Sequence, residues 1–532
     1  MATGTPSAGR RIVRNTAIFS VATGLSRIAG LGREIVASAY FGTSGAFSAF
    51  TIAFQVPNLV RSLFADAALA AAFVPVFTEL LETKNHKDAY RLASTLFFVI
   101  LGVLGIIAAA FMVAAPWVMP LFTGDAFDQE LIDLTVGLSQ VLFPIVVLLG
   151  VNGLLVGILN AHDHFSVPAL SPLLWNAIII AFLVGAHATL DGQDQLYGYA
   201  VGVLVGTAAQ VAVAVPVLRR VGFELRVVVA LRDPRLRRVL KLMLPVTIGL
   251  GLINFNLLVS SVLGSFVSEG APRAIDAAFR VYMLPQGMFS VAVATVLFPA
   301  LSRLAARRDL DGLRALTSTG LRGIFLLLIP CAVLTLVLAE PIVRLVYERG
   351  DFDAQSTRDV AEALFWFSFS LPFAGANLLL TRTFFSLQRP WAPTALAGLN
   401  LAVNVVVALA LYRSLGIAGI VIATAVATAV MTVAQALVLR RSLHGRLEAG
   451  TTLAAIARML VAAAALGGVA WVTWMGLDEL LGRSLPAQLV AVGTGIAAGG
   501  LVYAGAVLLL RVPEAARIER MVEAWLRRRR QP

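Results

Sequence analysis

The chain has 532 residues, of which 59% are hydrophobic and only 14% are charged, and its formal net charge is +12. A soluble fold of this length needs far more polar surface, so the composition predicts an all-α polytopic membrane protein. The apolar runs are too long for the alternating, roughly ten-residue strands of a transmembrane β-barrel. Cys331 is the single cysteine, which excludes a disulfide within the chain.

Fourteen apolar segments are each long enough to cross a bilayer as a helix. Several exceed the roughly 20 residues that a perpendicular helix needs, which predicts tilt or kinks at internal prolines. In chain order the predicted spans are 15–40, 46–78, 92–120, 132–159, 167–188, 196–218, 240–267, 274–301, 318–339, 358–385, 391–412, 416–438, 454–477 and 486–510.

The basic residues are unevenly distributed between the two sides that these spans define. Of the 42 Lys and Arg, 31 fall in the tails and loops on the side of the termini, six on the opposite side and five within spans. The positive-inside rule then places both termini in the cytoplasm. The excess of positive charge reflects topology, so we expect no nucleic-acid partner.

The body of the chain repeats itself. Residues 142–176 resemble residues 370–404 at a constant offset, with Pro144 on Pro372 and Asn176 on Asn404. Residues 196–220 resemble 417–441 in the same order. Such a parallel repeat predicts two six-helix lobes related by a pseudo-two-fold axis along the membrane normal. The predicted division is 1–232 for the first lobe, 233–445 for the second, and 446–532 for two extra helices and a basic cytoplasmic tail.

Of the five arginines within spans, we single out Arg27, Arg33, Arg61 and Arg280. An arginine at the middle of a membrane helix costs about 2.5–3.5 kcal/mol, so the four together cost on the order of 10 kcal/mol. This cost predicts that they face a wet cavity or an anionic partner. Guanidinium suits phosphate in particular, because its planar fork matches two oxygens and it stays charged.

The alternative is that these arginines pair locally or reach an interface. Neighbouring side chains on a helix point about 100° apart, so we do not expect Arg33 to pair with Glu34. Arg280 has only Asp276, one turn earlier, as a possible partner. We therefore favour an anion-binding role over local pairing.

Motifs for nucleotide binding, metalloprotease chemistry and serine hydrolysis are absent from the sequence, so we expect no enzyme and no catalytic residue. The five histidines are scattered. His162 and His164 flank Asp163 in a short loop, which we interpret as solvated.

Three segments resemble the MurJ (MviN) family of lipid II flippases, which belongs to the multidrug/oligosaccharidyl-lipid/polysaccharide exporter superfamily. They are SRIAGLGREIVASAYFG (26–42), AFQVPNLVRSLFADAALAAAFVPVFTE (53–79) and AFRVYMLPQGMFSVAVATVLFPALSR (278–303). The resemblance runs from about residue 12 to 440 and is densest over 26–79.

The resemblance implies a fold of fourteen helices, alternating access, and a place in peptidoglycan biosynthesis and cell-wall biogenesis in the bacterial inner membrane. It implies that the four arginines hold the diphosphate of undecaprenyl-diphosphate-linked disaccharide-pentapeptide. It also implies that the last two helices form a groove for the polyprenyl tail. We add candidate cavity or gating residues around these arginines: Ser26, Ala29, Gly30, Glu34, Asn58 and Asp66.

Departures from the family bear on a sodium site. Some relatives carry Asp in the seventh helix where this chain has Ser260, beside Asn and Thr residues of helices 11 and 12. We therefore expect no required cofactor and at most a weak sodium site, formed by Ser260, Asn400, Asn404 and Thr424.

Two other functions stay open at this stage. One is an exporter of another undecaprenyl-diphosphate-linked glycan, and the other is a non-transporting scaffold for cell-wall enzymes. Under the main interpretation the partners are lipid II, membrane lipids and cell-wall synthesis or division proteins, and the chain acts as a monomer.

Overall fold

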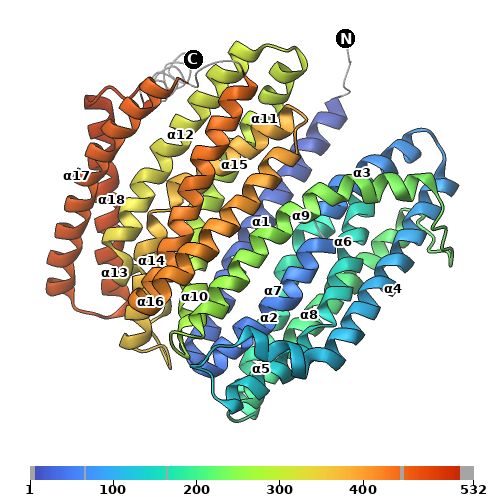
Figure 1. Cartoon of the computed structure of the whole chain (residues 1–532), viewed down its shortest axis with the longest axis horizontal. Helices are drawn as coiled ribbons and strands as arrows, with labels where there is room; N and C mark the ends of the chain where they lie inside the picture. Colours follow the sequence, from blue (N-terminus) through green and yellow to red (C-terminus); the bar gives the residue numbers. More distant parts are fainter. Residues whose placement is uncertain (1–5, 65–66, 163, 165, 444–447, 516–532) are drawn as a thin grey trace. The chain divides into compact units, whose positions relative to one another are not determined.

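The computed structural model describes residues 6–64, 67–162, 164, 166–443 and 448–515, and in this part of the chain every regular element is helical (Figure 1). The first half contains α1 (Pro6–Phe41), α2 (Gly45–Phe64), α3 (Ala67–Glu82), α4 (His86–Val118), η1 (Met119–Phe122), α5 (Gln129–Leu142), α6 (Ile145–Ala161), α7 (Ser166–Thr189), α8 (Asp194–Arg220) and α9 (Pro234–Gly264). The second half contains α10 (Ala271–Pro285), the π-helix η2 (Gln286–Ser290), α11 (Val291–Ala306), α12 (Leu310–Val337), α13 (Ala339–Tyr347), α14 (Ala354–Ser368), α15 (Leu371–Ser386), α16 (Trp391–Ser442), α17 (Ala449–Leu481) and α18 (Leu485–Leu509).

Ten helical segments in the described residues are long and apolar enough to cross a membrane, or eleven if the bent pair α14 and α15 forms one span. The chain is therefore a multi-pass membrane protein, and the predicted all-α class is confirmed. The helices α1 and α2 are not among the ten. These two carry Arg27, Arg33 and Arg61, whose charges lower the hydropathy of their segments.

The helices are interrupted at two kinds of position. One is the junction between two consecutive predicted spans, and the other is a proline inside a predicted span. The 52-residue α16 is interrupted at Gly416, whose φ of 56° is open to glycine and strained for other residues. Residue 416 is also where two predicted spans meet. Helices α14 and α15 bend by 50° just before Pro372, and α5 gives way to α6 at Pro144. These two prolines occupy matching positions in the sequence repeat.

The chain forms two compact units. One comprises Met1–Arg273 and Arg349–Phe352, and the other comprises Ala274–Glu348 and Asp353–Pro532. The predicted lobe boundary at 232/233 follows the repeat, whereas this division follows packing, and the two differ over α9. In the first unit α9 packs against α2 and α3.

In the first unit, a short loop from far along the sequence closes over the end of α1. The amide of Asp351 donates a hydrogen bond of 2.8 Å to the carbonyl of Ala39. Gly42 and Gly350 both have positive φ, and a Cβ on either would come within 2.5 Å of a carbonyl oxygen of this contact. Only glycine fits at these two positions, which fixes the C-terminal end of α1.

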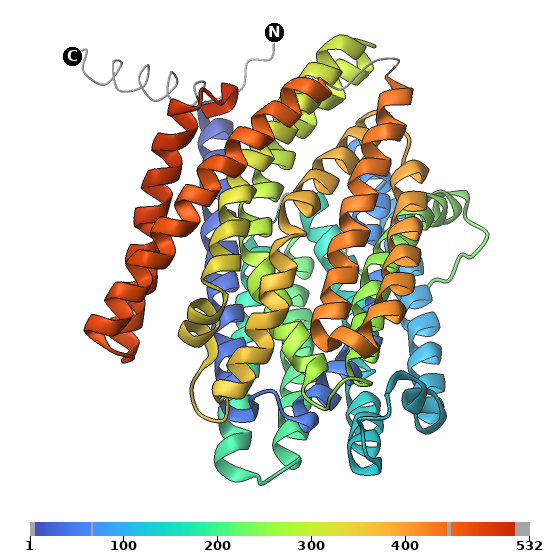
Figure 2. The same ribbon diagram turned by 60° about the vertical axis from the view of Figure 1, so that its left-hand side comes forward.

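In the second unit, the last two helices pack against each other and against α12 (Figure 2). Arg322 of α12 joins them through a cluster of charges in which Arg322 and Glu514 are buried and Glu448 is exposed. Its Nε donates to Glu514 at 2.5 Å and its Nη1 donates to Glu448 at 2.7 Å. Glu448 precedes α17 and Glu514 follows α18, so one guanidinium holds both ends of the helical hairpin.

Replacing Arg322 by methionine should destabilise the protein by about 3–5 kcal/mol, because it leaves the buried carboxylate of Glu514 without its partner. The measurement is the fraction of monodisperse protein that survives heating in detergent. Arg314→Met is the control on the same helix, because Arg314 pairs with the exposed Asp311 and such pairs contribute about 0–1 kcal/mol. Equal losses in the two variants would contradict this role of Arg322.

Candidate functional site

Arg33 and Glu34 of α1 form a buried ion pair, with 2.7 Å between Nη2 of Arg33 and Oε1 of Glu34. The expectation that these neighbours stay apart was wrong. The 100° between adjacent positions separates the Cβ directions only, and both side chains are long enough to turn back toward each other. The functional candidate Arg33 thus already has an acidic partner within the protein.

A second arginine, which we did not predict as a site residue, completes this cluster. Arg273, which we placed in a loop outside the membrane, lies in the first turn of α10 with only 1% of its surface exposed. Its Nη2 donates to Oε2 of Glu34 at 3.2 Å and to the hydroxyl of Ser38 at 2.9 Å. Its guanidinium lies 4.1 Å from the ring centre of Phe47. The only signal in the sequence is that apolar residues follow it directly.

Aromatic contacts hold Arg33 from another side. Its guanidinium lies 4.8 Å from the ring centre of Trp175, and Trp175 donates its indole N–H to Thr207 at 3.0 Å. Nε of Arg33 is buried and has no hydrogen-bond partner among the residues that the structure describes. An unsatisfied donor on a buried charge is costly, so this guanidinium has hydrogen-bonding capacity left for an anion.

Arg61, on the last turn of α2, is held by amides. Its Nε and Nη2 both donate to Oδ1 of Asn58, at 2.9 and 2.7 Å. The Nδ2 of Asn58 donates in turn to Asn254 of α9 at 3.4 Å. Asn58 therefore orients Arg61, and its role as a cavity or gating residue stays a prediction.

Arg27 differs from the other three, because its side chain is exposed and pairs with no acid in the described part of the chain. The residues next to Arg27 pack α1 against α7. The carbonyl of Ser26 accepts a 3.4 Å hydrogen bond from Asn176 of α7, and a Cβ on Gly30 would lie 3.8 Å from the same amide. Ala29 is half-buried beside them.

Arg280 belongs to the second unit, where its Nε lies 2.8 Å from Asp276. This is the local pairing that the sequence allowed and that we did not favour, and a third of the Arg280 side chain stays exposed. The π-helix η2 begins six residues later, directly after Pro285. A fifth arginine within a span, Arg382, lies over the ring of Phe298 at 5.4 Å.

Two of the predicted sodium ligands contact each other within the second unit. In the second unit, Asn404 donates to the hydroxyl of Thr424 at 2.9 Å, and its buried Oδ1 has no partner among the described residues. Ser260, in the first unit, donates to the carbonyl of Asn256. In the described residues no group of three or more His, Cys, Asp or Glu could hold a metal. Asp66 lies outside the described residues.

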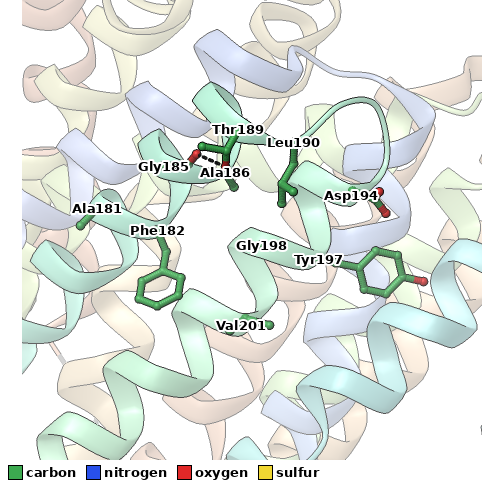
Figure 3. A pocket seen from close by; sticks show the side chains of 10 residues that line it. All are labelled: Ala181, Phe182, Gly185, Ala186, Thr189, Leu190, Asp194, Tyr197, Gly198 and Val201. Carbon is green, nitrogen blue, oxygen red and sulfur yellow. Dashed lines mark hydrogen bonds between the residues drawn. The ribbon is translucent and has the colours of Figure 1, made fainter.

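A surface pocket of about 660 Å³ lies between α7 and α8 in the first unit (Figure 3). Phe182 and Leu190 line it, Gly185 and Gly198 leave space in it, and Tyr197 lies at its edge. None of the predicted arginines takes part in it. We therefore assign no role in anion binding to this apolar pocket.

The match to known proteins decides the family. The family model described as lipid II flippase MurJ matches residues 37–487, which is most of the chain. The chain belongs to the MurJ family. Its curated relatives include the "Probable lipid II flippase MurJ" of Rhizobium meliloti (strain 1021), which is 32% identical over 506 residues covering 92% of each chain.

Solved structures agree on the fold. A structure of lipid II flippase MurJ in an inward closed conformation matches with a TM-score of 0.76 and 23% identity, covering 93% of this chain and 99% of that one. A MATE family multidrug resistance transporter of the MOP superfamily, in an inward-facing conformation, matches with a TM-score of 0.67 and 14% identity, covering 79% and 94%. The family expected from the sequence is thus confirmed. Arg61 and Arg280 lie inside the MurJ match, and Arg27 and Arg33 lie just before it.

Proposed function

We propose that this protein translocates lipid II, the undecaprenyl-diphosphate-linked peptidoglycan precursor, from the cytoplasmic to the outer leaflet of the bacterial inner membrane by alternating access. The match to the MurJ family over residues 37–487 carries this proposal. The relative from Rhizobium meliloti is named a probable lipid II flippase, and it is similar to the chain over 92% of the chain's length.

The arginines supply the chemistry that the proposal needs. A diphosphate in the membrane must lose much of its water, and guanidinium groups replace it with charge-assisted hydrogen bonds. We assign this role to Arg27, Arg33, Arg61 and Arg280. Arg27 is accessible and pairs with no acid in the described residues, and Asn58 orients the fork of Arg61.

The finer architecture belongs to the same proposal. We propose fourteen membrane spans with both termini in the cytoplasm and two lobes related by the sequence repeat. The division of α16 at Gly416, the bent pair α14 and α15, and the arginine-bearing helices α1 and α2 would together supply the spans beyond the ten apolar ones. Transport then requires no bound cofactor, and the neutral oxygens of Asn404 and Thr424 form at most a weak cation site.

Expression of this chain in a bacterium depleted of its own lipid II flippase tests the proposal. We expect growth to resume and lipid II to become accessible in the outer leaflet, as measured by an externally added enzyme that cleaves it. Failure to restore either, with normal amounts of the protein in the membrane, would overturn the proposal. Restored export of a different undecaprenyl-diphosphate-linked glycan would favour another cargo.

A further inference from the structure

The cluster around Glu34 joins two arginines from distant parts of the sequence. Arg33 comes from the same helix α1, and Arg273 comes from the start of α10. One oxygen of the carboxylate faces Arg33 at 2.7 Å and the other faces Arg273 at 3.2 Å. All three side chains are at least 90% buried. The cluster therefore holds two positive charges and one negative charge away from solvent.

Arg273 is fixed more firmly than a partner of Glu34 alone would require. Besides Glu34, its side chain reaches Ser38 at 2.9 Å, its backbone amide donates to Ser48 at 3.3 Å, and its guanidinium stacks on Phe47. A cation–π contact of this kind is favourable where water is excluded. These contacts come from α1 and α2, so Arg273 presents its Nη2 to Glu34 from a rigid frame.

The consequence concerns Arg33. A carboxylate and a guanidinium prefer to pair through two parallel hydrogen bonds. In this structure Nη2 of Arg33 donates to Glu34, whereas Nε of Arg33 is buried without a partner. Because Arg273 engages the second oxygen of Glu34, that oxygen is drawn away from the fork of Arg33. Arg33 is thus held through one nitrogen and keeps a donor for another oxygen anion.

We propose that Arg273 is a positioning residue for substrate binding, which prevents Glu34 from pairing fully with Arg33 and so keeps Arg33 exchangeable for the diphosphate. This inference rests on the proposed function, because the anion in question is the diphosphate of lipid II. A phosphate oxygen displaces one hydrogen bond more easily than two parallel ones. Arg273 acts on the substrate only through Glu34.

The test compares the binding of lipid II to purified full-length variants in detergent. Arg273→Gln should weaken the affinity about tenfold, because the released oxygen of Glu34 then pairs with the fork of Arg33. Adding Glu34→Gln to this variant should restore the affinity to within about threefold of the wild type, because the competing carboxylate is gone. A loss followed by rescue is the signature of positioning, since damage to packing would accumulate in the double variant.

Arg273→Lys provides a milder substitution, because lysine keeps one charged donor for Glu34 and changes the packing less. It should lose affinity about threefold, and the loss should again disappear in combination with Glu34→Gln. Arg344→Gln is the control, because Arg344 is also buried and pairs with acids, at Glu340 and Glu348, in the second unit. Its affinity should equal that of the wild type.

The results separate this inference from the proposed function. If the wild type itself fails to bind lipid II, the proposed function fails. If the wild type binds lipid II, two results refute the positioning role of Arg273 while the function stands. One is that neither Arg273→Gln nor Arg273→Lys weakens binding. The other is that adding Glu34→Gln restores the affinity of neither variant.

Discussion

Alanine at Arg27, Arg61 or Arg280 should each abolish growth of a flippase-depleted bacterium that depends on this protein. Each substitution removes a charged fork that replaces water around the diphosphate. Removing one such interaction costs about 1.5–3 kcal/mol, and a buried charge left without its counterpart costs more. The result should be easiest to interpret for Arg27, whose exposed guanidinium pairs with no acid in the described residues and so has no evident structural duty.

The amount of each variant in the membrane should stay near that of the wild type. Taking an arginine out of a membrane helix removes an insertion cost of about 2.5–3.5 kcal/mol, so membrane insertion gives no reason for loss. Arg→Lys at the same positions should restore growth only in part, because a point charge cannot form the two-pronged pairing. Growth assays and quantitative immunoblots of membranes measure both effects.

Arg382→Ala is the matched control for this series. Arg382 also lies within a predicted span, but its guanidinium stacks on Phe298 and we assign it no role toward the substrate. Its alanine variant should support normal growth. If the alanine variants of Arg27, Arg61 and Arg280 grow as well as this control, these arginines serve the fold and not the substrate.

Collapsing the membrane potential should slow the export of lipid II, whereas replacing sodium should leave it unchanged. Lipid II carries roughly two negative charges at its diphosphate and the cell interior is negative, so outward movement is helped by up to about 4–5 kcal/mol per 100 mV. The arginines stay with the protein while access changes, so part of this gain survives. This chain has Ser260 where some relatives carry Asp, and the absence of that acid also argues against coupling to sodium.

Cells treated with valinomycin and potassium test this expectation. The rate at which newly made lipid II becomes accessible outside should fall, and cells moved from sodium to choline medium should show the original rate. The reverse pattern would contradict a role of the potential. It would direct attention to Asn404 and Thr424, where a buried amide oxygen is available in the described residues.

The helices could be predicted from the sequence because apolar runs of membrane length have few alternatives. Each predicted range lies over one helix or over consecutive helices of the described chain. The break within α16 was predictable from the join of two spans at residue 416. The π-helix after Pro285 was not, because the sequence there differs little from an ordinary helix with a proline.

The site was predictable in its residue types but not in its pairings. The cost of arginine in a membrane singled out Arg33 and Arg61, yet no sequence rule links Glu34 to Arg273, which follows 239 positions later. Arg273 looked like an ordinary loop cation because it stands at a predicted span boundary. Its burial depends on Ser38, Ser48 and Phe47, and only the folded chain assembles these contacts.

The π-helix Gln286–Ser290 has a consequence for how this gene can change. A π turn contains one residue more than an α turn, and each residue rotates a helix by about 100°. Losing one codon within this stretch would convert the turn to ordinary α-helix and keep the hydrogen-bond ladder continuous. Because a π turn and an α turn both complete one full rotation, the segment that bears Arg280 would keep its direction relative to α11. This short stretch is therefore a place where the gene can lose one residue in frame without redirecting the charge of Arg280.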